Sequence, residues 1–124
     1  MELLFYILSG LIAVSPLIAG IILKIRPPKK INCWYGFRTE ISASSQEAWD
    51  YAHKICANLL LICSIVEVTV YASCFIVCYL FLHGYEWIYM LITLVLVIVV
   101  FTIVYATVQI KTQRFIKDLQ NQRS

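Results

Sequence analysis

Residues 59–82 read LLLICSIVEVTVYASCFIVCYLFL, and this apolar stretch decides the fold of the 124-residue chain. It is long enough to cross the hydrocarbon core of a bilayer as a helix. Four residues, HGYE at 83–86, separate it from a second apolar run at about 87–108. Because so short a connection joins antiparallel neighbours, the two runs are predicted to form a hairpin of transmembrane helices.

A third apolar run covers residues 3–23, near the N-terminus. Glu2 stands where a signal peptide would carry positive charge, so the run is interpreted as a true span, with a kink expected at Pro16. The chain is 61% hydrophobic, and its mean hydropathy is +0.82. A soluble fold of this length could not bury so much apolar surface. The predicted fold class is therefore all-α, a single membrane domain over 1–124 with three transmembrane helices.

The positive charges predict the orientation of these helices. All ten Lys and Arg residues lie in two segments, the connection at 24–58 and the tail at 109–124. With three spans, both segments fall on the same side of the membrane, which the positive-inside rule makes cytoplasmic. The N-terminus is then predicted to be outside and the C-terminus inside.

The connection is predicted to be partly helical. Pro27 and Pro28 end the first helix. The sequence SSQE at 44–47 fits a capping box, with Ser44 as N-cap and Glu47 reaching back. An amphipathic pattern begins there and no breaker follows before the second span. We therefore expect one long helix, whose cytoplasmic extension leads into that span.

A polar seam follows one face of this helix. Trp49 and His53 are four residues apart, and the same face continues to Glu67 near the middle of the bilayer. A carboxyl group there is costly unless it is protonated or hydrogen-bonded. It is either a proton- or ligand-binding acid or an acid that joins helices. The expected partners are hydroxyl groups on neighbouring spans, those of Ser15, Thr102 and Tyr105.

The sequence NCWYGFRT at 32–39 forms a polar island in the connection. Gly36 is expected to permit a turn that other residues would resist. The aromatic residues Trp34, Tyr35 and Phe37 are expected either to lie at the lipid headgroups or to line a cavity closed by the loop.

Arg38 could bind a lipid phosphate, a peptide carboxylate or an acid of the loop. Three acids are close in sequence: Glu40, Glu47 and Asp50. An ion pair within the loop is therefore the favoured interpretation.

The remaining patterns argue against several classes of protein. The five cysteines include no C-x-x-C pair, so no metal site is predicted. The basic residues flank membrane spans, which makes nucleic acid a poor partner. No nucleophile or cofactor motif accompanies His53, so no catalytic residue and no cofactor are predicted, and an enzyme is the less favoured class.

The motif NCWYGFRT, followed by Ser45-x-x-x-Trp49 and by YAHK at 51–54, resembles the SdpI family of bacterial integral membrane proteins. The family pattern is matched at Asn32, Gly36, Arg38, Thr39, Trp49 and His53. Glu40, however, stands where a proline is usual. The named member of that family confers immunity to a secreted toxic peptide. The resemblance thus implies a multi-pass protein of the bacterial inner membrane that gives protection by binding a peptide or a lipid.

Two alternatives stay open: a lipid- or metabolite-handling enzyme or carrier using Arg38 with His53 or Glu67, and an adaptor recruiting a cytoplasmic regulator. Because three helices barely enclose a cavity, a homo-oligomer is also expected. The predicted binding residues are Asn32, Trp34, Tyr35, Gly36, Arg38, Thr39, Trp49, His53 and Glu67.

Overall fold

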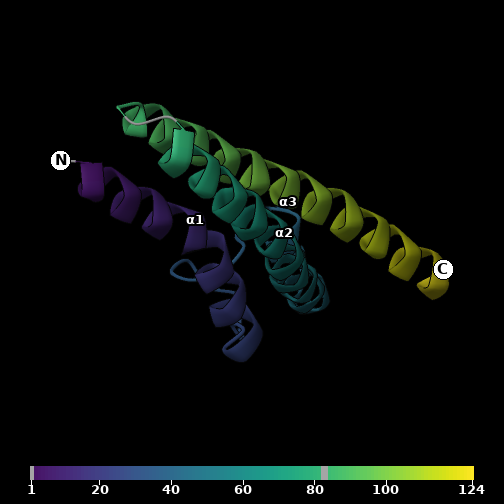
Figure 1. The fold of residues 1–124 in the computed structure, drawn as a ribbon. Coiled ribbons are helices and arrows are strands. Elements are labelled where there is room, and N and C mark those ends of the chain that lie inside the picture. The colour runs from purple at the N-terminus through teal and green to yellow at the C-terminus, as the bar shows by residue number, and fades with distance from the viewer. Residues whose placement is uncertain (1, 82–83) are drawn as a thin grey trace.

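The computed structural model describes residues 2–81 and 84–124, and the elements found there are all helical. In order they are α1 (Glu2–Ile25), the short 3-10 helix η1 (Ser42–Ser44), α2 (Gln46–Phe81) and α3 (Glu86–Arg123). Figure 1 shows α2 and α3 side by side as an antiparallel hairpin, with α1 beside them. The three long helices are each apolar enough to cross a membrane, which confirms the predicted fold class.

Two helices are longer than a membrane requires. At a rise of about 1.5 Å per residue, the 36 residues of α2 extend well beyond a hydrocarbon core of about 30 Å. The predicted extension of the second span is confirmed as residues 46–58 of α2, continuous with the apolar part. The last residue predicted for that span, Leu82, lies outside the described residues. α3 continues through the predicted tail to Arg123.

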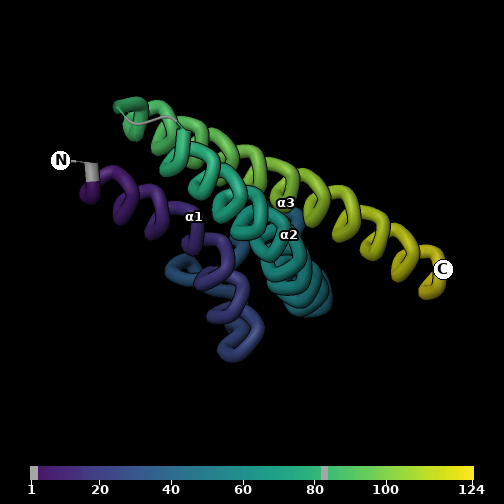
Figure 2. Tube along the Cα trace, viewed as in Figure 1, coloured from purple at the N-terminus to yellow at the C-terminus, as the bar shows by residue number. Residues whose placement is uncertain are grey.

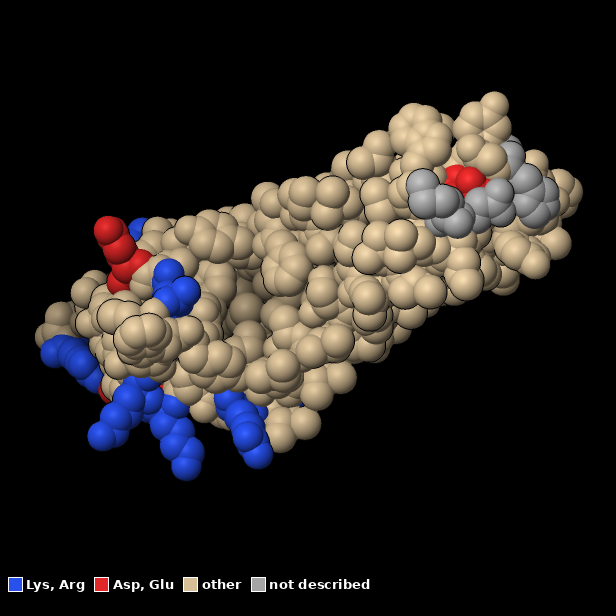
Figure 3. Space-filling model, turned by 90° about the vertical axis from the view of Figure 1, so that its left-hand side faces the viewer, with Lys and Arg blue, Asp and Glu red and all other residues tan. Residues whose placement is uncertain are grey.

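The connection 26–45 lies at one end of the bundle, which we call the loop end (Figure 2). The opposite end, where α2 and α3 meet and α1 begins, is the hairpin end. Lys and Arg gather at the loop end, and the long middle of the face in Figure 3 carries none. This separation matches a chain whose middle lies in lipid.

Small residues at Gly10 and Gly20 let α1 approach α2 closely. A Cβ at Gly20 would lie 3.0 Å from the Leu60 Cβ, and one at Gly10 would lie 3.4 Å from the Tyr71 hydroxyl. α1 also passes through Pro16, which leaves the Ile12 carbonyl without its helical N–H donor. The Ser15 hydroxyl donates to that carbonyl at 2.7 Å and so replaces the missing bond.

The hydrophobic core lies toward the loop end. It joins all three long helices through Leu23, Ala52, Cys56, Ala57, Leu60, Val104 and Val108. Beyond it, the extension of α2 packs on the end of α3. The rings of Tyr51 and Phe115 stack with centroids 4.2 Å apart, and Arg123 pairs with Glu47 at 2.8 Å.

The predicted capping box is wrong by one residue. Ser44 closes η1, where its hydroxyl donates to the Ile41 carbonyl. Ser45 caps α2 instead, because its Oγ accepts the Ala48 N–H at 3.1 Å. Glu47 therefore stands one position too early to reach back to the cap, and it pairs with Arg123 instead.

Candidate functional site

The site is built around Trp49 and His53, one turn apart in the extension of α2. Both side chains are buried, at 0% and 1% exposed, and their rings lie 4.4 Å apart. Trp49 donates its Nε1–H to the Pro28 carbonyl at 2.8 Å. The Phe37 backbone N–H donates to His53 Nε2 at 2.8 Å. These two bonds tie the start and the middle of the connection to the same helix.

The hydrogen bonds define the protonation of His53. Since Nε2 accepts from Phe37, the proton lies on Nδ1, which donates to the Trp49 carbonyl at 2.7 Å. His53 lies in the extension of α2, outside the predicted span. Burial lowers the pKa of its imidazole, although the hydrogen bond to Trp49 and the Asp50 charge act in the opposite direction. His53 is thus a neutral brace with both ring nitrogens engaged.

Gly36 makes this contact between loop and helix possible, as the sequence predicted. Its φ is +103°, a conformation that L residues with a side chain rarely adopt. A Cβ at this position would also collide with the His53 ring and would lie 2.9 Å from Pro28 Cγ. The turn and the close approach therefore both require glycine.

Asn32 folds the first half of the motif. Its Oδ1 accepts the backbone N–H groups of Trp34 at 3.0 Å and Tyr35 at 2.9 Å, while its amide donates to the Lys30 carbonyl. Tyr35 donates its hydroxyl to the Arg26 carbonyl at 2.9 Å. The short side-chain carbonyl of Asn32 thus takes the place of a backbone acceptor in this turn.

Thr39 links the second half of the motif to α3. Its hydroxyl donates to Gln109 Oε1 at 2.9 Å. Ser42, fully buried, donates to the Phe37 carbonyl and accepts the Thr39 N–H. Sequence reasoning missed Ser42 and Gln109. The three-residue spacing of Thr39 and Ser42, which suits local side chain-to-backbone bonds, was a signal for the first, but none existed for the second.

The predicted ion pair of Arg38 is wrong. Its guanidinium donates to the Cys33 carbonyl, and within residues 2–81 and 84–124 the one ion pair found is Arg123–Glu47. The Arg38 side chain is exposed, as is Trp34, which is 92% exposed. Neither packs with Trp49 and His53, so their predicted binding roles concern the outer surface of the loop.

Glu67 lies apart from the loop, in the predicted span. It is 5% exposed, and neither of its carboxyl oxygens has a hydrogen-bond partner in the described part of the chain. The expected bonds to Ser15 and Thr102 are wrong, because these hydroxyls donate to carbonyls of their own helices. Tyr105 is half exposed on α3 and does not bond to Glu67 either.

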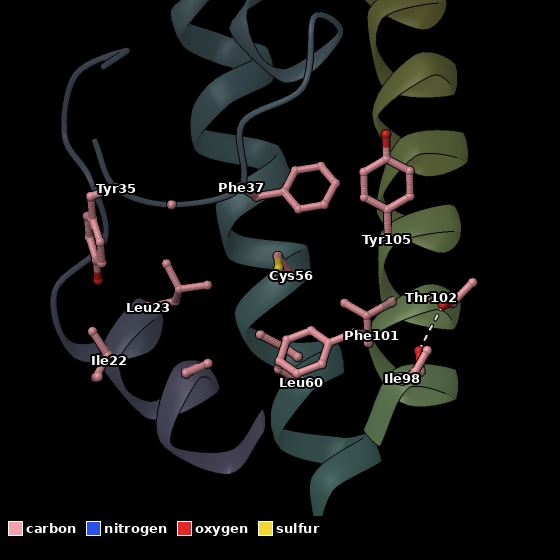
Figure 4. A pocket seen from close by; sticks show the side chains of 13 residues that line it. Ile22, Leu23, Tyr35, Phe37, Cys56, Leu60, Ile98, Phe101, Thr102 and Tyr105 are labelled. Carbon is pink, nitrogen blue, oxygen red and sulfur yellow. Dashed lines mark hydrogen bonds between the residues drawn. The ribbon is translucent and has the colours of Figure 1, made fainter. Parts of the chain in front are cut away.

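An apolar cavity of about 700 Å³ opens beneath the loop. Tyr35, Gly36 and Phe37 border it on the loop side, and Figure 4 shows Leu23 of α1 and Leu60 of α2 among its walls. The Phe37 ring meets Tyr105 of α3, with centroids 5.5 Å apart. Of the two interpretations of the loop aromatics, a cavity lining describes Tyr35 and Phe37, and Trp34 remains on the surface.

The fold and this loop define a class: a small multi-pass membrane protein whose three-helix bundle is capped by a folded polar motif. The chain belongs to the SdpI/YfhL protein family, whose family model matches residues 29–106. It is also similar to the uncharacterized protein YfhL of Bacillus subtilis (strain 168), with 44% identity over 50 residues. That alignment covers 40% of this chain and 46% of the relative, less than half its length. No solved structure matches the chain.

Proposed function

We propose that this protein protects a bacterial cell against a secreted antimicrobial peptide by binding that peptide, or the lipid it attacks, in the cavity beneath the loop. The cavity is the observation that carries the proposal. Its volume of about 700 Å³ lies within the range of small-molecule sites, about 300–1,000 Å³. The immunity role itself is what the resemblance to the SdpI family implies.

The lining of the cavity suits an apolar ligand. Apart from Thr102 and the Tyr35 and Tyr105 hydroxyls, the side chains around it are hydrocarbon or sulfur groups. The Thr102 hydroxyl donates to Ile98 within α3, and that of Tyr35 donates to Arg26. An acyl chain or the apolar face of a peptide would be stabilised there by burial, at about 25 cal/mol per Å².

We further propose that the loop end faces the cytoplasm of a bacterial inner membrane. All Lys and Arg residues of the chain lie in the two segments that meet there, as the positive-inside rule expects. A ligand would then reach the cavity from the inner leaflet. A homo-oligomer and a cytoplasmic regulator remain predictions.

The enzyme or carrier alternative is not favoured by the contacts. A histidine that transfers protons needs a ring nitrogen free to meet the substrate. Both ring nitrogens of His53 are hydrogen-bonded to backbone groups. Arg38 and Glu67 lie in different parts of the molecule, one exposed on the loop and one buried in α2. They form no common site with His53.

The test compares the growth of a deletion strain with and without this gene, challenged by a panel of secreted antimicrobial peptides. We expect the gene to restore survival against at least one peptide. Unchanged survival across the panel would count against immunity.

A cavity-filling variant locates the activity. Ala19 of α1 lines the cavity, so Ala19→Phe should reduce protection at least tenfold at equal expression. Ala72, exposed in α2 and away from the cavity, provides the matched control. Ala72→Phe adds the same ring and should protect as well as the parent chain; equal loss in both variants would separate protection from this cavity.

A further inference from the structure

A second cavity, of about 450 Å³, lies on the loop end between the last turn of α1 and the extension of α2. Three lysines line it: Lys24, Lys29 and Lys54. They come from α1, the connection and α2, so the fold brings together charges that are distant in sequence. This cavity is distinct from the apolar cavity of the proposed function, although Leu23 borders both.

The walls of this cavity are held by hydrogen bonds. The buried Trp49 indole donates to the Pro28 carbonyl at 2.8 Å, and the Gln46 amide donates to the Lys29 carbonyl at 2.9 Å. Both bonds fasten the connection to α2 on either side of the Pro28–Lys29 peptide. Lys29 is therefore placed beside the helix that carries Lys54, which reduces the ordering cost of binding a ligand.

The charge of the cavity is positive. Its one carboxylate, Asp50, accepts a hydrogen bond from Gln46 at 2.8 Å. Lys24 donates to Asn58 Oδ1 at 2.6 Å and retains further N–H donors, since an ammonium group has three. With three ammonium groups and one carboxylate in its lining, the cavity carries a net positive charge, which attracts an anion.

The location selects the kind of anion. Lys24 lies in the last turn of the apolar helix α1, and two other lining residues, Leu23 and Ala57, belong to the hydrophobic core. The cavity thus lies at the boundary between apolar spans and polar connection, at the depth of lipid headgroups. Basic pockets between transmembrane helices at that depth bind anionic headgroups.

We propose that Lys24, Lys29 and Lys54 form a binding site for the phosphate headgroup of an anionic phospholipid. The ammonium groups would surround the phosphate, and the acyl chains would lie along the apolar surface of α1. The inference does not depend on the proposed immunity function, because it concerns a different cavity.

Binding of phosphatidylglycerol to the full chain in detergent, followed by native mass spectrometry, tests the proposal. One lysine near a lipid phosphate contributes about fivefold in affinity, and three contribute on the order of 100-fold. The triple variant Lys24→Gln, Lys29→Gln, Lys54→Gln should therefore lose phosphatidylglycerol affinity by roughly that factor. Retained affinity would overturn the proposal.

The matched control removes the same charge elsewhere at the loop end. Lys111→Gln, Arg114→Gln and Lys117→Gln on α3 should change the affinity less than about threefold. An equal loss in both triple variants would show general attraction to the basic end and would overturn the site. If the first triple variant does not fold, Lys29→Gln alone should lose about fivefold, and an unchanged affinity would overturn the site.

Two further arms identify the ligand. Phosphatidylcholine, which carries a phosphate but no net charge, should bind the parent chain at least tenfold more weakly than phosphatidylglycerol; equal binding would overturn an anionic site. Inorganic phosphate at the same concentration should not displace phosphatidylglycerol. Displacement would assign the cavity to free phosphate and overturn the lipid.

Discussion

The contact between Gly36 and His53 shows why the loop motif needs its residue types. The loop backbone passes so close to the imidazole that no Cβ fits at position 36. The next residue, Phe37, donates its N–H to the ring. Asn32 and Thr39 shape the chain on either side through their own hydrogen bonds. Much of the motif thus braces the loop, and the cavity beneath depends on that brace.

Substitution of Gly36 tests the brace. Gly36→Ala should lower the thermal midpoint in detergent strongly, because a positive φ costs roughly 1–2 kcal/mol for an L residue and the Cβ also displaces His53. Gly84 has a similar φ of +94° with nothing near its missing Cβ. Gly84→Ala should therefore show the backbone cost alone, and equal losses in the two variants would contradict the steric contact at Gly36.

The stability of the loop should depend on pH through His53. Its folded pKa is lowered by burial, so above the unfolded value of about 6.5 both states are neutral and the stability is complete. As pH falls below about 6.5, the unfolded state binds a proton that the folded state resists, and stability is lost. Thermal unfolding at pH 7.5 and 5.5 measures this loss.

His53→Gln provides the control, since glutamine does not titrate over that range. The variant should be less stable at pH 7.5, and its thermal midpoint should change less between the two pH values. The same change with pH in both proteins would assign the effect to another group.

At this scale the sequence predicted the role of Gly36 but not the partner of Arg38. A positive φ is a local property, and glycine signals it directly. The predicted ion pair is wrong because the Arg38 guanidinium donates to the Cys33 carbonyl, while Glu47 meets Arg123 at the far end of the chain. Sequence proximity does not specify which of several charges will meet.

At the scale of a single element, α3 continues beyond the predicted span through residues 109–123. Thr112 there is fully buried, and its hydroxyl has no hydrogen-bond partner among the described residues. Its neighbour Val108 is also fully buried. The end of α3 therefore packs as a core element against α2, and it is more than a charged tail.

Replacement of Thr112 should stabilise the protein. A buried, unpaired hydroxyl costs about 1–3 kcal/mol, so Thr112→Val should raise the thermal midpoint in detergent. Thr93 is also buried, but its hydroxyl donates to the Tyr89 carbonyl at 2.9 Å. Thr93→Val should leave stability unchanged or slightly lower, and a rise in both variants would point to hydrophobicity alone.

The helices themselves were predictable, with errors confined to their ends. Apolar length identified all three spans, because a bilayer imposes the same requirement on any chain. The cap of α2 was misplaced by one residue within the serine run at 44–45, since either serine can act as N-cap. Only the 3-10 turn before it decided between them.

At the scale of the whole molecule, the orientation in the membrane can be tested with a native cysteine. Cys33 is exposed on the loop and free. A membrane-impermeant maleimide should fail to label it in intact cells and should label it after permeabilisation, because the loop end is proposed to face the cytoplasm. Labelling of intact cells would contradict this orientation.

Cys33→Ser checks the source of the signal. Cys56 is buried, and the other three cysteines are half-buried in the apolar part of α2. The variant should therefore lose most of the label after permeabilisation. A signal that remains would come from one of these four thiols.

The sequence by itself determined that the chain is a three-helix membrane protein with its positive charge at one end and a family motif in one connection. Hydropathy and charge are properties of short segments, so they can be read without knowing which segments meet. Only the tertiary structure decided that His53 packs against Gly36 and that Thr39 reaches Gln109. It also decided that Glu67 lies buried without a hydrogen-bond partner among the described residues and that three lysines line one cavity. Those facts depend on contacts between residues far apart in the chain, which arise only once the helices pack.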